Sequence, residues 1–445
     1  MSRKSLVLIA TILGSGMVVL DGVVVNLALP KIATDLNATF ADLQWIADAY
    51  LLSLSALILL GGSLGDIFGR RRIYLIGLWG FTVFSVLCGL APNADFLIAF
   101  RLVQGAFGAL LVPAGLAILN TNFPPEERGK AIGRWSAWGA VVVPLGPLVG
   151  GYILNVGSWR WIFFINVPLG AVCDLLAVKS FRESKSQNAR RLDYGGSLLA
   201  ILALAGITYG LIEGPVSHWS AVTILCLIVG LLLVPLFIYY EKRQKDPIIQ
   251  LSLFKSRNFS GANLMTFGMY GALAGFMFAM LIYLQTGIGY TPLAAGLCLL
   301  PVSAGILLLS SRMGALSSKY GPRYFVTVGP LVVAVAILSL LNYQAGDSFV
   351  TFLLPRMALF GVGMGILVAP LTTTVMSSVE MDSSNIASAI NNAAARVAGL
   401  IIVAIVGLAG AVHFFRFSVI ICFILALTSG VISYLLIQNP KRVAS

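Results

Sequence analysis

The chain has 445 residues, of which 58% are hydrophobic and only 10% are charged. Soluble domains carry about 25% charged residues, so this composition predicts a membrane protein and excludes a large soluble domain. The net charge of +12 does not indicate nucleic-acid binding, because the basic residues fall in short segments between apolar runs, where such residues set membrane topology.

Apolar runs predict an all-α membrane protein with fourteen transmembrane helices, since each span needs about 20 residues. The expected helices cover residues 5–29, 41–62, 73–91, 96–120, 130–152, 161–179, 193–213, 220–241, 259–283, 291–310, 324–343, 349–378, 387–412 and 413–437. The first run is expected to be a retained helix rather than a signal peptide. The break between the last two helices rests on the polar group that runs from His413 to Arg416.

Basic residues support this alternation of helices and loops. Every second loop is rich in basic residues. These loops contain Arg3, Lys4, Arg70–Arg72, Arg128, Lys130, Arg134, the basic residues within 179–191 and within 242–257, Arg312, Lys319, Arg323, Lys441 and Arg442. The loops between these hold only Lys31, Arg160 and Arg416. Positive loops stay on the cytoplasmic side, so the pattern predicts that both termini and the arginine-rich turns lie in the cytoplasm.

An internal repeat organises the chain. The charged turn that begins at Gly62 has a counterpart that begins at Gly314, 252 residues later, and the surroundings of Arg101 resemble those of Arg356, 255 residues later. Repeats of this kind are typical of transporters built from two related bundles. The sequence therefore predicts six-helix bundles at residues 1–181 and 259–445, joined by residues 182–258, a linker with two additional transmembrane helices.

Asp21 and Arg101 are charged residues inside apolar runs. A charge at the centre of a membrane helix costs about 2.5 to 3.5 kcal/mol on insertion scales, so it is a candidate for function. Asp21 lies nine residues before Pro30, and Arg101 lies nine residues after Pro92, which places them at comparable depth. An arginine partner would keep the aspartate ionised until a proton competes. The alternative is a static ion pair that only fixes the packing.

Further polar residues within the apolar runs are candidates for lining a cavity. They are Asn26, Gln44, Trp45, Asp48, Tyr50, Gln104, Asn391, Asn392 and Arg396. Asp48 shares the cavity with Asp21 or marks the outer interface, and the sequence leaves both possibilities open. Asn391 and Asn392 either line the cavity of the second half or form hydrogen bonds between helices.

The expected helix 130–152 is unusually rich in glycine and proline. It contains Pro144, Gly146, Pro147, Gly150 and Gly151. Prolines remove backbone donors and bend a helix, while glycines permit close helix contact. The run predicts a hinge or seal between conformations, with a rigid helix seam as the alternative.

The sequence lacks the residue patterns of catalytic sites. His218 and His413 lie in or beside outer loops, and neither belongs to a metal-spaced cluster or a Ser/His/Asp arrangement. No phosphate-binding Gly-x4-Gly-Lys-Ser/Thr run is present. We therefore expect no enzyme, no cofactor and no metal site, but transport driven by an ion gradient.

Five segments in the same order resemble the major facilitator superfamily, and in particular its fourteen-helix drug:proton antiporter branch. They are Leu20-Asp21 to Pro30, Gly62-x-Leu64-Gly65-Asp66-x-x-Gly69-Arg70-Arg71, Arg101-x-x-Gln104-Gly105, Gly146-Pro147-x-x-Gly150-Gly151 and Trp159-Arg160-Trp161-x-Phe163-x-Ile165-Asn166-x-Pro168. The resemblance covers nearly the whole chain.

The resemblance implies roles for several of these residues. Asp21 and Arg101 would form the proton-coupling site, and Gly62, Asp66, Gly69, Arg70 and Arg71 would form a cytoplasmic latch that locks one conformation. The expected protein is a monomeric, proton-coupled antiporter of the multidrug-efflux type in the lipid bilayer of the inner membrane, which exports amphipathic or lipophilic small molecules. The alternative is an exporter or importer of an endogenous metabolite, lipid or siderophore on the same fold.

Overall fold

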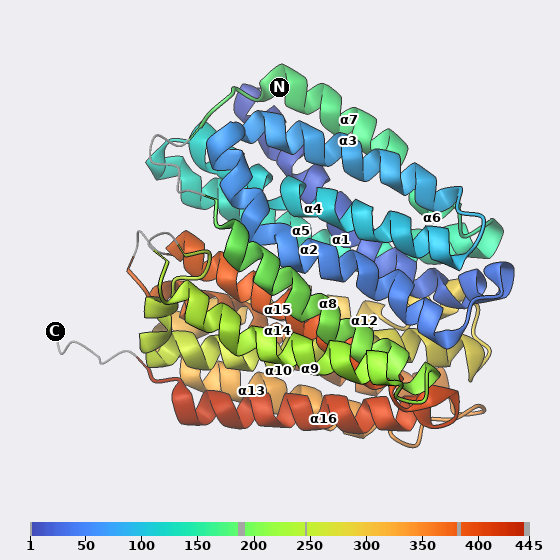
Figure 1. Cartoon of the computed structure of the whole chain (residues 1–445). Coiled ribbons are helices and arrows are strands. Elements are labelled where there is room, and N and C mark those ends of the chain that lie inside the picture. The colour runs from blue at the N-terminus through green and yellow to red at the C-terminus, as the bar shows by residue number, and fades with distance from the viewer. Residues whose placement is uncertain (1, 186–191, 245–246, 381–383, 440–445) are drawn as a thin grey trace. The chain divides into compact units, whose positions relative to one another are not determined.

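The computed structural model describes residues 2–185, 192–244, 247–380 and 384–439, and all regular secondary structure among them is helical. The helices are α1 (Arg3–Leu36), α2 (Phe40–Phe68), α3 (Arg70–Gly89), α4 (Ala94–Asn122), α5 (Pro125–Val156), α6 (Trp161–Phe164), α7 (Asn166–Ser180), α8 (Tyr194–Val216), α9 (Ala221–Glu241), η1 (Leu251–Lys255), α10 (Arg257–Thr286), α11 (Pro292–Leu297), α12 (Leu300–Tyr320), α13 (Pro322–Leu338), η2 (Phe349–Leu353), α14 (Leu354–Ser377), α15 (Ser384–Gly407) and α16 (Gly410–Leu436) (Figure 1).

Twelve of the fourteen expected spans are long and apolar enough to cross a membrane, so the protein is a multi-pass membrane protein. The other two, expected at 130–152 and 324–343, are helical but have shorter described apolar stretches. These stretches are Leu145–Val156 in α5 and the 17-residue helix α13. Seventeen residues are at the lower limit for a hydrocarbon core about 30 Å thick. The count of fourteen stays a prediction.

Several helix ends differ from those predicted. Helix α1 continues through Pro30 to Leu36 instead of ending near residue 29, since membrane helices tolerate proline where neighbouring groups satisfy the freed carbonyl. The break expected at 413–416 is wrong, because those residues lie inside α16 and the chain turns between Gly407 and Gly410. Glycines mark a helix end more reliably than isolated polar residues do.

The helices group into two units, Met1–Ile248 with Thr291–Gly296, and Ile249–Tyr290 with Leu297–Ser445. In the first unit α2 and α3 pack on α4, and α1 packs on α5 and α7. In the second unit α12 and α13 pack on α14, and α10 packs on α15 and α16. The same packing order thus occurs twice, in keeping with the sequence repeat. The three-part division at residues 181 and 258 stays a prediction.

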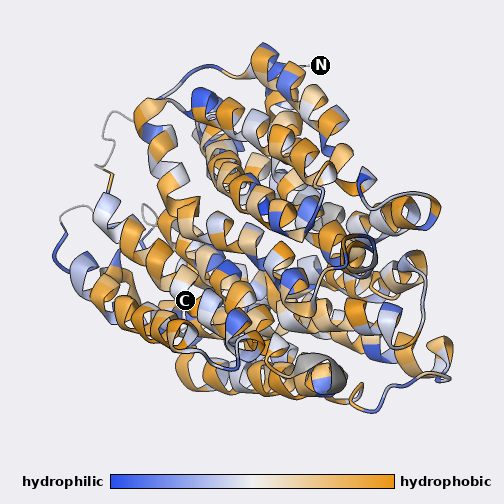
Figure 2. Ribbon diagram, turned by 45° about the vertical axis from the view of Figure 1, so that its right-hand side comes forward, coloured by the Kyte–Doolittle hydropathy of each residue, from blue (hydrophilic) through white to orange (hydrophobic). Residues whose placement is uncertain are grey.

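Helices α8 and α9 pack on each other, and α8 also packs on α2. Figure 2 shows that hydrophobic residues follow most of the helices, whereas hydrophilic residues gather in several connecting segments. The apolar side chains of α9 are largely exposed, for example Leu225 at 61% and Leu232 at 63%. Such a surface is unfavourable in water and suits contact with lipid chains.

The predicted latch turn connects α2 to α3. Asp66 pairs with Arg70 one helical turn later, with Nη2 to Oδ1 at 2.7 Å. The first backbone N–H groups of α3 are capped by Glu183, which follows α7: Arg71 N donates to Oε1 and Arg72 N donates to Oε2, each at 3.1 Å. The anionic side chain is favourable at this positive helix end. Glu183 was not predicted as part of the turn.

Gly69 is required at this turn for two reasons. Its φ is +113°, in the region that side chains rarely adopt, and an added Cβ would lie 2.7 Å from the carboxylate carbon of Glu183. We expect Gly69→Ala to lower the free energy of unfolding by about 1–3 kcal/mol for backbone strain alone, with a further loss from the displaced Glu183 cap. Thermal unfolding of the purified protein measures the loss.

Gly289→Ala separates these two contributions. Gly289 also has a positive φ, +84°, but an added Cβ would meet nothing within 4 Å. The variant Gly289→Ala should therefore lose the stability that backbone strain costs, without any loss from a collision with a side chain such as Glu183. If both variants lost the same stability, Glu183 would not contribute to the requirement for glycine at position 69.

Candidate functional site

A buried ion pair lies within the first unit, between α1 and α4. Asp21 is 3% exposed and Arg101 is 1% exposed. Arg101 Nη1 donates to Asp21 Oδ2. Gln104 Nε2 and Asn166 Nδ2 donate to the other carboxylate oxygen, Oδ1, at 3.1 and 3.2 Å. The structure thus brings the two charged residues together and surrounds the carboxylate with N–H donors.

Arg101 has further partners besides Asp21. Its Nε donates to the carbonyl oxygen of Ile46 in α2 at 3.2 Å, and its Nη1 donates to Gln104 Oε1 at 2.8 Å. The guanidinium carbon lies 4.0 Å from the centre of the Tyr50 ring, and the Tyr50 hydroxyl donates to Val18 O in α1 at 2.9 Å. Three helices therefore fix the arginine at one position.

The electrostatics of this pair depend on burial. Moving two ions out of water costs several kcal/mol each, and their mutual attraction with additional hydrogen bonds offsets that cost only in favourable geometry. The contacts of Asp21 and Arg101 supply that geometry. Neutralising either partner would leave the other charge buried without its counter-ion, so binding a proton at Asp21 would weaken the contact between α1 and α4.

Asn166 belongs to this network but was not predicted to be a site residue. It is the first residue of α7 and is 1% exposed. Its Nδ2 also donates to Ser85 Oγ in α3 at 2.9 Å, and the Ser85 hydroxyl donates to the carbonyl oxygen of Phe163 at 2.9 Å. The available signal was the segment Ile165-Asn166-x-Pro168, which the family resemblance already contained.

Helix α2 carries most of the other predicted lining residues of the first unit. Gln44 and Asp48 are buried, and Trp45 donates through Nε1 to Glu213 of α8 at 2.7 Å. Asp48 is 0% exposed, and neither of its carboxylate oxygens has a hydrogen-bond partner. A buried ionised carboxylate without partners is very unfavourable. Asp48 is thus a second buried carboxyl group, and it takes no part in the hydrogen bonds around Asp21.

In the second unit, the predicted residues of α15 do not form an ion-pair network of the same kind among the described contacts. Asn391 Nδ2 donates to Asn263 Oδ1 at 3.2 Å and to Thr266 Oγ1 at 2.8 Å, both in α10. Asn392 is exposed and donates to a backbone oxygen of its own helix. Arg396 is half-buried in the same helix. The interhelical hydrogen bond, one of the two roles considered for Asn391, is present.

The glycines of α5 contact α1 close to Asp21. A Cβ added to Gly146 would lie 2.9 Å from Val23, and a Cβ added to Gly150 would lie 2.7 Å from Val24. Gly151 packs instead on the backbone of Leu293, where the corresponding distance is 2.8 Å.

The remaining predicted residues of α1 and α5 are less informative. Asn26 is half-buried in α1, and Pro147 of α5 is buried. Pro144 also lies in α5, but its side chain is outside the described part of the protein.

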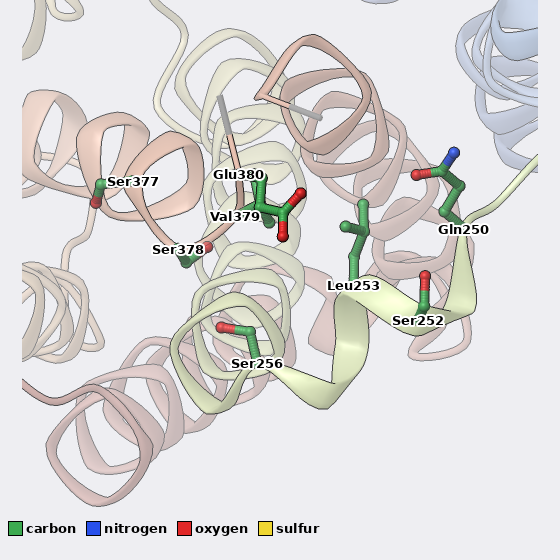
Figure 3. A pocket seen from close by; sticks show the side chains of 8 residues that line it. All are labelled: Gln250, Ser252, Leu253, Ser256, Ser377, Ser378, Val379 and Glu380. Carbon is green, nitrogen blue, oxygen red and sulfur yellow. The ribbon is translucent and has the colours of Figure 1, made fainter. Parts of the chain in front are cut away.

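Two hollows are lined by none of the residues that form hydrogen bonds with Asp21. The first, of about 590 Å³, is in the second unit between η1 and the end of α14, and Figure 3 shows its lining of Gln250, Ser252, Leu253, Ser256, Ser377, Ser378, Val379 and Glu380. The second, of about 520 Å³, is lined by apolar side chains of α5, α6 and α7 together with Gly157 and Ile165. None of the predicted lining residues contributes to either. Among the described residues, no three His, Cys, Asp or Glu side chains group as a metal site.

Comparison with known proteins gives a consistent result. The family model described as Major Facilitator Superfamily matches residues 11–403. The multidrug resistance protein Stp of Mycobacterium tuberculosis is 34% identical over 410 residues, which cover 92% of this chain and 76% of Stp. The puromycin resistance protein pur8 of Streptomyces alboniger is 35% identical over 395 residues, covering 87% of this chain and 78% of pur8.

A solved structure shares the fold at low sequence identity. It is a bacterial homologue of the human lysosomal transporter Spinster, described as inward-facing and unoccupied. The TM-score is 0.73 at 14% identity, and the superposition covers 98% of this chain and 97% of the other.

Proposed function

Because the chain belongs to the Major Facilitator Superfamily, we propose that it is a proton-coupled antiporter that exports amphipathic or lipophilic small molecules by alternating access. Family membership identifies it as a transport protein and not an enzyme. Relatives that confer drug resistance support efflux as the task. The observation that carries proton coupling is the Asp21–Arg101 pair, buried among membrane-spanning helices and held by two further side-chain donors.

The proposed coupling follows from the charges of the pair. With Asp21 ionised, its attraction to Arg101 holds α1 against α4. A proton that reaches Asp21 removes the negative charge, so the attraction ends, while Arg101 keeps its bond to the Ile46 carbonyl and its contact with the Tyr50 ring. The arrangement of α1 with the lowest free energy then changes, and one bundle moves relative to the other. Substrate and proton bind in alternation because each favours a different state.

The other predicted elements complete this proposal. The turn around Asp66 would act as a cytoplasmic latch, and the glycines of α5 would act as a hinge or seal, because they contact α1 close to Asp21. Counting α5 and α13 as spans gives fourteen helices, with two six-helix bundles and an added pair. We place the protein in the inner membrane, as a monomer with both termini in the cytoplasm.

Substituting Asp21 by asparagine tests the proposal. The amide cannot carry a proton in place of the carboxylate, so we expect Asp21→Asn to reduce proton-driven efflux in reconstituted vesicles to the level of empty vesicles. The fold should persist, because Arg101 keeps two of its hydrogen bonds and the new amide oxygen accepts a third. Substrate-induced proton movement, measured with a pH-sensitive dye, gives the readout, and size-exclusion chromatography reports the folded state.

A panel of cationic, neutral and anionic lipophiles defines the substrate side of the same assay. Proton movement in response to any of them in the wild-type protein, and its loss in Asp21→Asn, would support the assignment. Undiminished efflux in the variant would refute coupling through Asp21.

A further inference from the structure

The carboxylate of Asp21 is surrounded by hydrogen-bond donors. Oδ2 accepts from Arg101, and Oδ1 accepts from Gln104 and Asn166. This arrangement suits an ionised carboxylate, which is an acceptor only. A protonated carboxyl also has an O–H donor, and burying a donor without an acceptor is unfavourable. A protonated Asp21 therefore needs an acceptor from within the network.

Two side chains beside the carboxylate carry an acceptor oxygen. Gln104 Oε1 already accepts from Arg101 at 2.8 Å and from the Cys88 thiol at 3.6 Å. Asn166 Oδ1 is buried and has no hydrogen-bond partner. The amide of Asn166 thus has an acceptor oxygen that its present orientation leaves unused.

The neighbours of Asn166 determine that orientation. The Ser85 hydroxyl donates to the carbonyl oxygen of Phe163, so its oxygen can only accept from Asn166. The ionised carboxylate of Asp21 can also only accept. Nδ2 must therefore face both groups. Rotating the amide by half a turn about its Cβ–Cγ bond exchanges the two atoms and places Oδ1 beside the carboxyl group of Asp21.

We infer that Asn166 is the residue that detects protonation of Asp21, by reversing its amide. This inference rests on the proposed proton coupling at Asp21. In the ionised state, Nδ2 donates to both Asp21 and Ser85. In the protonated state, Oδ1 accepts from the new O–H group and also replaces Nδ2 beside Ser85, so the Ser85 hydroxyl turns from the carbonyl oxygen of Phe163 to donate to Oδ1. One proton on α1 thereby reverses the hydrogen bond between α7 and α3 and removes the bond from Ser85 of α3 to Phe163 of α6.

Among the side chains that the structure describes, few titratable groups face Asp21 from the helices around it. Arg101 faces it from α4, and Cys88 of α3 is linked to it through Gln104. From α2, Tyr50 contacts Arg101, and Asp48 is buried two residues before it. The contact with α5 is made by the uncharged Gly146 and Gly150, and the contact with α7 is made by the neutral Asn166 itself. Asp21 is therefore the acid to which this amide is directly bonded.

Threonine and valine at position 166 form a matched pair of equal shape. The hydroxyl of Asn166→Thr can donate to a carboxylate and accept from a carboxyl, whereas Asn166→Val can do neither. After exchange into D2O, infrared difference spectra between acid and neutral pH give the O–D stretch of protonated Asp21, identified by its absence in Asp21→Asn. We expect a broad band at low wavenumber in the wild type and Asn166→Thr, and a narrower band at higher wavenumber in Asn166→Val.

Transport measurements give a second comparison of Asn166→Val with Asn166→Thr. Hydrogen bonds to an ionised group are stronger than bonds between neutral groups, so Asn166→Val weakens the ionised state more than the protonated one. We expect the pH midpoint of efflux to move upward by about one unit in Asn166→Val, and to stay close to the wild-type value in Asn166→Thr. This comparison also serves if one variant yields too little protein for spectroscopy.

Asn120→Leu is the control for a general effect of removing a buried amide. Asn120 also has a buried Oδ1 without a partner, but it lies near the end of α4, away from Asp21. The variant Asn120→Leu should leave the O–D band of Asp21 unchanged. An identical band in Asn166→Val and Asn166→Thr would overturn the inference, as would a band that moves in Gln104→Leu only. If the wild type gave no Asp21-dependent band, the proposed coupling at Asp21 would itself be refuted.

Discussion

Replacing Arg101 with leucine is expected to abolish proton-driven efflux and to lower the free energy of unfolding by about 3–5 kcal/mol, the usual cost of breaking a buried ion pair. The substitution leaves the carboxylate of Asp21 with only Gln104 and Asn166 as donors. It also removes the cation that lies against Tyr50 and bonds to the carbonyl of Ile46. Thermal unfolding in detergent and efflux from vesicles measure the two losses.

The double variant Asp21→Asn/Arg101→Leu shows whether the stability loss comes from the unpaired charge. With no carboxylate left at position 21, the double variant should be more stable than Arg101→Leu while transport stays absent. Arg356→Leu is the matched control, because Arg356 bonds to the backbone oxygens of Ser339 and Phe352 and stacks on the Phe352 ring. The loss in free energy of unfolding caused by Arg356→Leu should add to the loss caused by Asp21→Asn when both are combined. Transport by Arg101→Leu at the wild-type rate would contradict the role of the pair.

The sequence predicted the ion pair because a charged residue inside an apolar run is costly and therefore conspicuous. Asp21 and Arg101 were identified on that basis, and the structure places them in contact. Their estimated depth was less accurate, since it assumed that the first helix ends at Pro30, whereas α1 continues to Leu36. The pairing was predictable from charge, but the length of the helix was not, because proline ends helices in water more strictly than in membranes.

Two other residues could not be identified in the same way. Asn166 carries no charge, and its importance depends on which side chains the fold brings to it from α1 and α3. Glu183 lies in a polar stretch that the sequence predicts to be part of the linker, yet its carboxylate caps the first turn of α3. In both cases the hydrogen-bond partners are more than 75 residues away in the chain. Neither residue is a charge inside an apolar run, so no local feature of the sequence marks it as the partner of a group that far away, as charge did for Asp21 and Arg101.

The close contact between α2 and α4 leads to the second large effect, at Gly105. A Cβ added there would overlap the carbonyl oxygen of Tyr50 and the hydroxyl of Ser53. A backbone oxygen cannot rotate away, so α2 and α4 would have to separate, and the Tyr50 ring would move from beneath Arg101. We expect Gly105→Ala to lower the free energy of unfolding by about 1–3 kcal/mol and to impair efflux, measured by thermal unfolding and vesicle transport.

Gly108→Ala, one turn later on the same helix, is the control that isolates this overlap. Its added Cβ would meet Leu54 at 3.4 Å and the Phe81 ring at 3.7 Å, which are ordinary contacts. Alanine is favoured over glycine in a helix by about 1 kcal/mol, so this variant should be neutral or slightly more stable. The two substitutions are chemically identical, so a loss of stability at Gly105 without a loss at Gly108 would come from the overlap with α2. Equal losses at both positions would mean that close approach of α2 to α4 does not hold Tyr50 and Arg101 in place.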